Sequence, residues 1–300
     1  MKIFLTGATG YIGGTLAKYL LRSGHSVRGL VRNTEKAQTL NRLGITPVLG
    51  SLEDTALLSR EAAAADAVIN TANADDEKPV KAFIEALRDS GKAFIHTSGS
   101  SVIADNARGA SASERVFDEN SPFVVNPFKQ ARFDLDQSII QSASLGIRSI
   151  VICPSLIYGV GSSLNPRSLQ IPTLVDNAVK EGRVEIVGAG ANRWSNVHIQ
   201  DLIQLYRLAL EESPAGAFYF AENGDASFIE LGNAISKRLD LDAVHSLSPE
   251  AAKQKWGERT AFFSLGSNSR VRANRARVLG WRPLHNSAVE WILNDMPMPN

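Results

Sequence analysis

A strand that runs directly into a glycine-spaced turn and then a helix constrains the fold of this chain more than any other feature. Residues 3–6 form a short apolar run, and Gly7, Gly10 and Gly13 follow at intervals of three. The first glycine permits a tight turn, the second lets a ligand approach the backbone, and the third allows close packing of helix against strand. The pattern of residues 11–23 then predicts the helix.

The same alternation of strand and helix continues to about residue 153. Apolar runs predict strands over residues 3–6, 26–31, 46–49, 67–70, 93–97 and 148–153. The segments between them predict helices over residues 11–23, 34–43, 54–64, 76–90 and 126–145, the last capped by Asn126 with Pro127 at its first position. Apolar strands joined by helices indicate a parallel sheet covered on both faces. We therefore expect an α/β fold with a doubly wound, Rossmann-type sheet.

In this context the glycine turn predicts a dinucleotide site. Backbone N–H groups at the start of the first helix, together with the helix dipole, favour the negative charge of a diphosphate. We expect the contacts to come from Gly7, Thr9, Gly10, Tyr11 and Ile12.

The end of the second predicted strand indicates which dinucleotide binds. An NAD site has an acidic residue there, which accepts from the ribose 2′-hydroxyl. This chain has Arg32 instead, and a guanidinium favours the 2′-phosphate of NADP. The alternative is a solvent-exposed arginine beside a loop. We expect NADP as the cofactor, with NAD less favoured.

The regular alternation ends after Pro154. Residues 159–172 are rich in Gly, Ser, Asn and Pro, and helices are predicted over residues 201–212 and 227–239. We expect residues 1–153 to form the dinucleotide-binding core and residues 154–300 to form mainly a smaller C-terminal substrate lobe. Core elements are expected to recur near residues 190–220.

Composition favours a globular protein and disfavours several kinds of partner. The chain is 44% hydrophobic and 21% charged, with a formal net charge of +1. We expect neither nucleic acid nor a membrane as partner, because the arginines of residues 270–277 are interpreted as a solvated helix face and no apolar run approaches the roughly 20 residues of a membrane span. The single Cys153 is expected to be a buried thiol, and no spacing suggests a metal site. These features favour a cytoplasmic location.

Three segments together carry a family resemblance: residues 6–13, Pro154–Gly159 and Arg193–Asp201. They resemble the short-chain dehydrogenase/reductase superfamily, in its extended branch of NAD-dependent epimerase/dehydratase-like proteins. The resemblance implies a Rossmann-type core with a substrate lobe. It also implies that Leu52, Ala72 and Pro154 lie near the cofactor, and that a homodimer forms through the helices of residues 76–90 and 127–144.

The catalytic pair of that family does not carry over. Its tyrosine falls on Phe128 and its lysine on Arg132, which a helix would place as neighbours on one face. Phenylalanine has no transferable proton, and Arg132 can hold ribose hydroxyls but cannot relay protons. Acid–base assistance contributes roughly 10²–10⁴-fold, so conventional carbonyl reduction is expected to be severely slowed.

Other side chains are candidates to replace the lost acid. The resemblance places the family's serine or threonine near Gly99, beside Ser100 and Ser101. Tyr158 follows a core strand and is expected to line the cleft, with a packing role as the competing interpretation. We therefore predict Tyr158, Ser100 and Ser101 as catalytic candidates.

Two histidines are expected to be structural. His96 lies inside a predicted strand, where a core histidine is favoured over a base. His198 is expected to form a polar cluster with Asn196 and Asp201 that ties the lobe to the core.

Three functions fit this combination. The first is an atypical short-chain oxidoreductase that reduces a small carbonyl or an activated double bond with NADPH. The second is a nucleotide-sugar epimerase or dehydratase, whose chemistry depends even more on the missing tyrosine. The third is a non-catalytic, NADP(H)-sensing regulatory protein. We expect the first, with a small molecule as the substrate.

Overall fold

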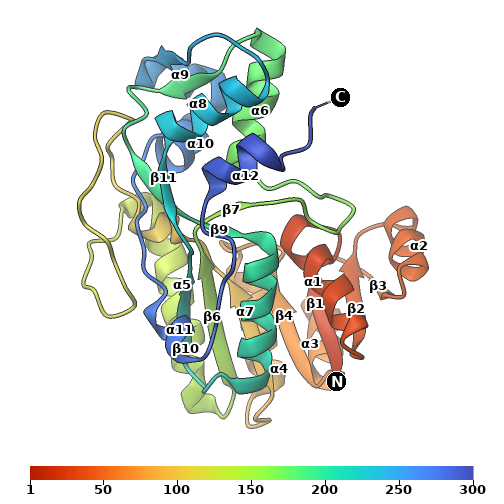
Figure 1. The fold of residues 1–300 in the computed structure, drawn as a ribbon. Helices are drawn as coiled ribbons and strands as arrows, with labels where there is room; N and C mark the ends of the chain where they lie inside the picture. Colours follow the sequence, from red (N-terminus) through yellow and green to blue (C-terminus); the bar gives the residue numbers. More distant parts are fainter. Residues whose placement is uncertain (300) are drawn as a thin grey trace.

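The computed structural model describes residues 1–299 and contains a seven-stranded sheet whose neighbouring strands are all parallel (Figure 1). In the order β10-β6-β5-β4-β1-β2-β3, the strands are Ala217–Ala221, Arg148–Pro154, Ala93–Thr97, Ala67–Asn70, Lys2–Thr6, Ser26–Val31 and Thr46–Leu49. The chain order reverses between β1 and β4, as it does in doubly wound folds. The predicted α/β fold with a Rossmann-type sheet is therefore confirmed.

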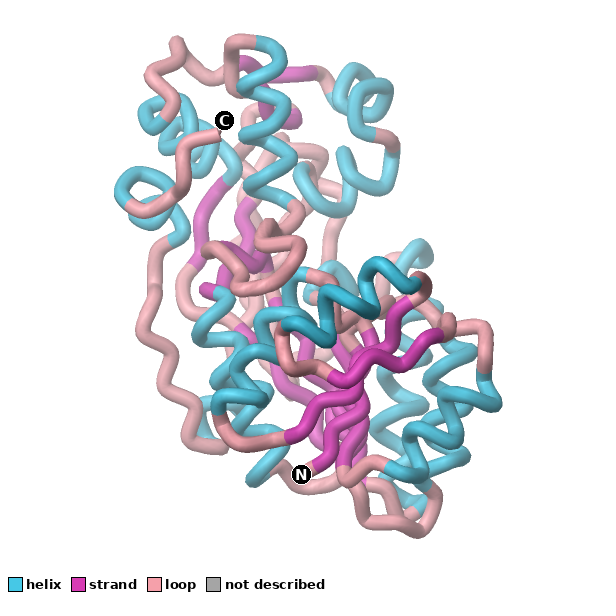
Figure 2. The backbone as a smooth tube through the Cα atoms, turned by 90° about the vertical axis from the view of Figure 1, so that its right-hand side faces the viewer, coloured by secondary structure: helices cyan, strands magenta, loops and turns pink. Residues whose placement is uncertain are grey.

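Helices cover both faces of this sheet (Figure 2). Successive side chains of a strand point to opposite faces, so Ile3 and Leu5 join one apolar cluster and Phe4 joins another. The first face carries α1 (Tyr11–Arg22), α2 (Thr34–Arg42) and α7 (Ile199–Glu212). The second carries α3 (Thr55–Ala64), α4 (Glu77–Leu87) and α5 (Gln130–Gln141).

The helix predicted over residues 126–145 is divided into three parts. Asn126 is the cap, as predicted, and its side chain accepts from the backbone N–H of Phe128 at 3.1 Å. A 3₁₀ turn, Pro127–Lys129, precedes α5, because the N–H of Lys129 bonds the carbonyl of Asn126 three residues back at 2.7 Å. A second 3₁₀ turn, Ser142–Leu145, follows α5. Helical structure therefore runs from Pro127 to Leu145 as predicted, with 3₁₀ turns at both ends of the α-helix.

Most of the residues after Pro154 form a smaller layer beyond the carboxyl ends of the main strands (Figure 1). Its strands form a three-stranded sheet and a two-stranded sheet, which comprise β7 (Leu156–Tyr158), β9 (Arg193–His198), β11 (Asp225–Ser227), β8 (Glu185–Val187) and β12 (His245–Leu247). They pack in a separate apolar cluster with α6 (Gln170–Glu181), α8 (Phe228–Arg238), α9 (Pro249–Trp256), the π-helical turn Ala261–Leu265 and α12 (Ala288–Asn294). The short α10 (Glu258–Thr260) leads into that π-helical turn. Helix α7 and strand β10 return to the main sheet.

The arginines near residue 270 form the solvated face expected from the sequence only in part, because Arg272 and Arg275 are exposed but Arg270 and Arg277 are partly buried. Arg270 binds Asp225 at 2.7 Å, and Arg277 binds Glu222, also at 2.7 Å. Glu222 is buried, and α11 covers only Asn274–Val278. The expectation fails for Arg270 and Arg277 because their carboxylate partners, Asp225 and Glu222, lie about 50 residues earlier in the chain and meet the arginines only in the folded protein.

Cys153 is fully buried, as predicted. Within residues 1–299, no helix combines the length and apolar character required to cross a bilayer. In the same residues, no three histidine, cysteine or acidic side chains are grouped to hold a metal ion.

Candidate functional site

The glycine turn between β1 and α1 lies where the strand order reverses, next to the loop that follows β4. Gly7 has φ +77°, and a Cβ there would lie 2.5 Å from Thr71 Oγ1. A Cβ at Gly13 would overlap the carbonyl oxygen of Gly7 as well as Thr71 Oγ1. Side chains at these two positions would push α1 away from the sheet, so the glycines are required by packing.

The start of α1 is open to an anion. The N–H of Gly10 bonds the carbonyl of Gly7 at 2.8 Å, but no side chain among residues 1–299 caps the helix and its first turn has no acidic residue. A Cβ at Gly10 would meet only the Gly7 carbonyl oxygen, at 3.2 Å, so the backbone there is accessible. Uncapped N–H groups and the helix dipole suit a diphosphate. The residues present therefore fit a dinucleotide cofactor.

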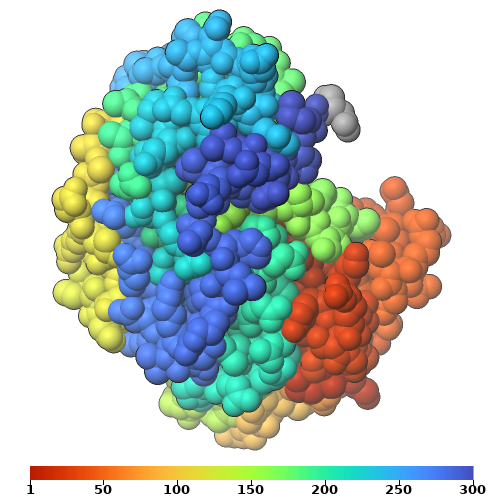
Figure 3. All heavy atoms as spheres, in the orientation of Figure 1, coloured from red at the N-terminus to blue at the C-terminus, as the bar shows by residue number. Residues whose placement is uncertain are grey.

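Tyr11 contacts the loop after β7 with its side chain. Its hydroxyl donates to the carbonyls of Gly159 at 2.8 Å and Tyr158 at 3.1 Å. One turn further along α1, Thr15 Oγ1 accepts from the N–H of Ser162 at 3.0 Å. This loop therefore lies against α1, where its yellow-green atoms meet the red ones in Figure 3. Only the backbone of Tyr11 is left for an anion.

The residues predicted to hold the adenosine half lie on neighbouring loops. Arg32 is exposed and, within residues 1–299, makes no ion pair or side-chain hydrogen bond. Leu52 is partly buried against the apolar cluster of α3 and α4. The N–H of Ala72 lies 3.4 Å from Asn70 Oδ1, at the carboxyl end of β4. Of these three residues, only Arg32 offers a charge to a phosphate.

A buried polar chain crosses the carboxyl ends of β1, β4 and β5. Thr6 Oγ1 donates to Asn70 Oδ1 at 2.5 Å, and Asn70 Nδ2 lies 3.1 Å from His96 Nδ1. Burial lowers the pKa of His96 to about 4, so the ring is neutral near pH 7. This placement supports the structural role expected for His96.

Arg132, which the resemblance aligns with the family's lysine, is held by a carboxylate. Its Nε and Nη2 donate to the two oxygens of Asp75 at 2.6 and 2.9 Å, and its Nη1 donates to Ser101 Oγ at 3.1 Å. Arg259 from α10 also binds Asp75, at 2.5 Å. Burial opposes ionisation of Asp75, but Arg132 and Arg259 outweigh it and hold the pKa of Asp75 at about 2. Arg132 therefore stays charged and oriented.

The three predicted catalytic candidates occupy different environments. Ser100 is buried, and its Oγ lies 2.8 Å from Ser269 Oγ. Tyr158 is 1% exposed and packs edge-on against His198 with ring centroids 5.1 Å apart, while burial raises the pKa of its phenol. The ring packs as the competing interpretation expects, but within residues 1–299 the buried hydroxyl of Tyr158 has no hydrogen-bond partner. Ser101 accepts from Arg132 and keeps its own O–H free to donate, so it is the candidate that lies at the Arg132 site.

Lys129 is the residue that sequence reasoning missed. It is 5% exposed and lines a cavity of about 300 Å³ with Phe128, Glu258, Arg259 and Phe263. Burial, followed by the charges of Arg132 and Arg259, lowers its pKa to about 8. The sequence around Lys129 does not indicate that its side chain is buried, because the residues that cover it, 258–263, lie far along the chain.

Phe128, which the resemblance aligns with the family's tyrosine, is 70% exposed. Its ring centroid lies 5.1 Å from that of Phe263 in the lobe. The loss of the hydroxyl has therefore left an aromatic wall on this side of the cavity.

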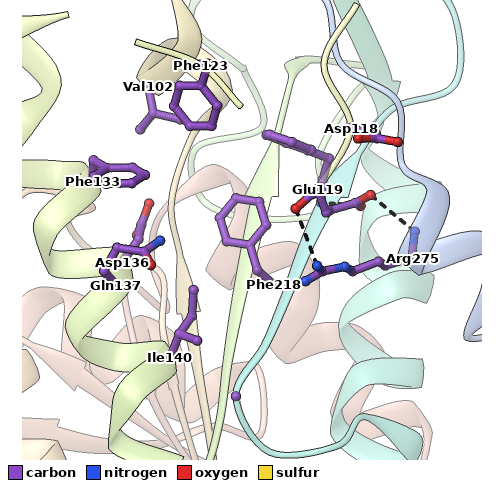
Figure 4. A pocket seen from close by; sticks show the side chains of 12 residues that line it. Val102, Asp118, Glu119, Phe123, Phe133, Asp136, Gln137, Ile140, Phe218 and Arg275 are labelled. Atoms are coloured by element: carbon purple, nitrogen blue, oxygen red, sulfur yellow. Dashed lines mark hydrogen bonds between the residues drawn. The ribbon is translucent and has the colours of Figure 1, made fainter. Parts of the chain in front are cut away.

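A second cavity, of about 240 Å³, lies between α5 and β10 (Figure 4). Phe133 and Phe218 line it, together with the acidic side chains of Asp136 and Glu119. Asp136 accepts from Ser98 Oγ at 2.5 Å, and burial raises its pKa to about 7. None of the residues predicted from the sequence as site residues lines this cavity.

Comparisons with known proteins agree with this architecture. The family described as "NAD dependent epimerase/dehydratase family" matches residues 3–219. Oxidase ucsJ from an Acremonium species is 32% identical, with 94% of this chain and 93% of the relative covered. A 4-hydroxy-2-methyl-3-oxo-4-farnesyl-3,4-dihydroquinoline-1-oxide ketoreductase from Stigmatella aurantiaca is 30% identical over 81% of this chain and 74% of its own length.

Solved structures extend the likeness across the whole fold. A dTDP-glucose 4,6-dehydratase from Bacillus anthracis, solved in complex with NAD, has a TM-score of 0.76 and 17% identity, covering 98% of this chain and 97% of that one. At this identity the likeness shows the fold alone.

Proposed function

This chain belongs to the NAD-dependent epimerase/dehydratase family, and from that membership we propose that it is a reductase that uses NADPH to reduce a small carbonyl compound or an activated double bond. The observation that carries the proposal is the combination of an uncapped, glycine-lined start of α1 with a charged Arg132 that holds Ser101. Both lie at the carboxyl edge of the parallel sheet, where such folds bind their ligands.

The chain's own residues account for each part of the cofactor. The N–H groups of residues 9–12 bind the diphosphate, Arg32 binds the 2′-phosphate, and Leu52 and Ala72 border the adenine half. Arg132 and Pro154 border the nicotinamide ribose. Arg132 has N–H groups left over for ribose hydroxyls, because its hydrogen bonds to Asp75 and Ser101 use three of its five. When bound, the cofactor supplies the hydride, and residues 154–300 form most of the substrate lobe.

The names of the relatives favour reduction over epimerisation. One of them is a ketoreductase, at 30% identity over most of this chain. A nucleotide-sugar epimerase or dehydratase would need the proton transfers of the missing tyrosine, which Phe128 cannot supply.

Coenzyme titration of the full chain tests the first half of the proposal. We expect NADPH to quench the fluorescence of the four tryptophans. We expect Arg32→Ala to raise the Kd for NADPH roughly 10- to 150-fold, because a charge-assisted hydrogen bond contributes about 1.5–3 kcal/mol. The Kd for NADH should not change. Arg42→Ala, an exposed arginine at the end of α2, is the matched control. If Arg32→Ala raised the Kd values for NADPH and NADH equally, the assignment of Arg32 to the 2′-phosphate would be contradicted.

Turnover tests the second half. Wild-type protein with NADPH is screened against aldehydes, ketones, enones and nucleotide sugars for loss of the reduced-cofactor absorbance. Oxidation of NADPH by a carbonyl or enone supports the reductase. Tight NADPH binding with no turnover of any compound would overturn it and favour the NADP(H)-sensing alternative.

A further inference from the structure

We propose that Lys129 is the proton donor of the reductase and that the cavity beside it takes aromatic or conjugated carbonyl compounds bearing a carboxylate. The proposal rests on the reductase function above. It assigns the proton-donor role to the residue that follows Phe128 in the sequence. Lys129 is the last residue of the 3₁₀ turn that leads into α5.

The position of Lys129 is the first argument. It is the residue after Phe128, and it lines the same cavity as the exposed ring of Phe128. The charges that act on it are those of Arg132 in α5, Arg259 in α10 and Asp75 in the loop after β4. Arg132 and Asp75 also form the ion pair that holds Ser101. Lys129 is therefore at the same edge of the sheet as the proposed nicotinamide site.

The missing partner of its ammonium is the second argument. Among residues 1–299 no carboxylate or carbonyl accepts a hydrogen bond from Lys129 Nζ, although the residue is 5% exposed. Nζ is nevertheless not fully occluded, and Lys129 lines the cavity. Burying a charged group without a partner is costly, and strongly perturbed groups in cavities concentrate at functional sites.

The acidity of Lys129 suits the chemistry. Burial and the two guanidinium charges lower its pKa to about 8, while Asp75 acts in the opposite direction. A general acid is most effective when its pKa lies near the working pH, and an ordinary lysine is too weak an acid for this role. Near pH 7 most of Lys129 is protonated and ready to donate.

The cavity's walls indicate the substrate class. The rings of Phe128 and Phe263 lie 5.1 Å apart at 44° to one another and offer apolar faces to a flat molecule. Glu258 is bound to Lys253 at 2.8 Å, which balances its charge. Arg259 uses Nη2 on Asp75 and is 72% exposed in its side chain, so it has donors left for a carboxylate.

The step balances in atoms and electrons. The carbonyl carbon receives the hydride that reduced NADP supplies, and the carbon–oxygen π pair moves to oxygen. That oxygen takes a proton from Lys129 Nζ and becomes the alcohol. Lys129 is left as the neutral amine and regains a proton from water. The substrate gains two electrons and the cofactor is left as NADP⁺.

A trapping experiment without cofactor tests the site itself. The full chain is incubated with 4-carboxybenzaldehyde between pH 6 and 10, imines are reduced with borohydride, and labelled lysines are quantified by mass spectrometry. We expect half-maximal labelling of Lys129 near pH 8, before the exposed Lys180 is labelled to the same extent, and protection by Phe263→Trp. Labelling of Lys129 no earlier than Lys180 would overturn the proposal.

A kinetic experiment tests the donor role. With NADPH and 4-carboxybenzaldehyde, Lys129→Met should lower kcat about 10²-fold and remove the decline of kcat above pH 8, because the protonated donor is then absent at every pH. Lys129→Arg keeps the charge but cannot give up its proton, so it should not restore kcat. Lys180→Met is the matched control and should behave as wild type. A Lys129→Met enzyme with wild-type kcat and the same alkaline decline would overturn the donor role.

The two proposals fail in different ways. If the wild-type protein turns over none of the screened compounds with NADPH, the reductase proposal is overturned, whatever the labelling of Lys129. Turnover that is unaffected by Lys129→Met and Lys129→Arg overturns only the assignment of the donor.

Discussion

At the scale of single residues, Gly159 joins three parts of the molecule. Its φ is +97°, and a Cβ there would overlap the imidazole of His198. Tyr158 pairs with His198 in the register of β7 and β9, and Tyr11 donates to the carbonyl of Gly159. The residue therefore connects the start of α1 to the lobe, and its lack of a side chain is what allows the imidazole to lie against it.

Gly159→Ala should reduce the free energy of unfolding by about 2–3 kcal/mol. The left-handed backbone accounts for about 1 kcal/mol of this, and the overlap with His198 accounts for the rest. Gly182→Ala is the matched control, because it has φ +68° and open space around the missing Cβ. Urea unfolding of both variants checks the prediction, and equal losses would show that His198 exerts no steric effect.

At the scale of elements, the start of α8 is held both by a local cap and by an ion pair with a distant part of the chain. Ser227 and Glu230 form a capping box at the start of α8, with the N–H of Ser227 bonded to Glu230 Oε2 at 2.7 Å and the N–H of Glu230 bonded to Ser227 Oγ at 3.2 Å. Arg193 in β9 also binds Glu230, at 3.0 Å. The cap therefore fixes α8 to the neighbouring sheet as well as satisfying its own backbone.

Ser227→Ala should cost about 1–2 kcal/mol of unfolding free energy, since it removes a buried cap and releases Glu230. Ser248→Ala, at the start of α9, should cost only about 0.5 kcal/mol, because Ser248 makes a single 3.2 Å bond to the N–H of Ala251 in an exposed setting. Thermal or urea unfolding distinguishes the two. A larger loss for Ser248→Ala would contradict this ranking of the caps.

At the scale of the whole molecule, a polar joint connects the lobe to the core. His198 stacks on His285 with ring centroids 3.9 Å apart, and Asp201 accepts from the N–H of His285 at 2.8 Å. The carbonyl of Asp201 also accepts from Trp281 Nε1 at 2.8 Å. The expected cluster of Asn196, His198 and Asp201 is present only in part: His285 links Asp201 to His198, whereas the side-chain amide of Asn196 donates to the carbonyl of Trp194 instead.

This joint makes stability depend on pH. Burial, followed by the charge of His285, lowers the pKa of His198 to about 4, whereas an unfolded histidine titrates near 6.5. Between these two pKa values the unfolded chain binds more protons at His198 than the folded chain does. The contribution of neutral His198 to the free energy of unfolding is therefore complete above about pH 6.5 and is lost as the pH falls to about 4. The loss is on the order of 2–3 kcal/mol for His198, and buried His96 behaves in the same way.

The variant His198→Asn checks this prediction. When the pH is lowered from 6.5 to 4.5, its free energy of unfolding should decrease less than that of the wild type. The comparison with wild type is necessary because Asp136 acts in the opposite sense. Its pKa is raised to about 7, so its contribution is complete below about pH 4 and is lost as the pH rises to 7. Parallel curves for wild type and His198→Asn would contradict the assignment.

Much of the fold and part of the site could be predicted because they depend on residues close together in the sequence. The glycine turn, the strand and helix alternation and the Asn126 cap involve spacings of a few positions. The family assignment rests on the same local segments and is confirmed by a match over residues 3–219. Cys153 was correctly expected to be buried, because its own strand is apolar on both sides.

Only the tertiary structure decided which side chains meet. Ser100 and Ser101 are adjacent, yet Ser269 engages one and Arg132 the other. Lys129 looks like a surface lysine until residues 258–263 cover it. The short-range pattern of a sequence specifies backbone conformation. Burial, charge pairing and acidity arise instead from contacts between segments that lie from about 30 to more than 160 residues apart, which a local pattern cannot predict.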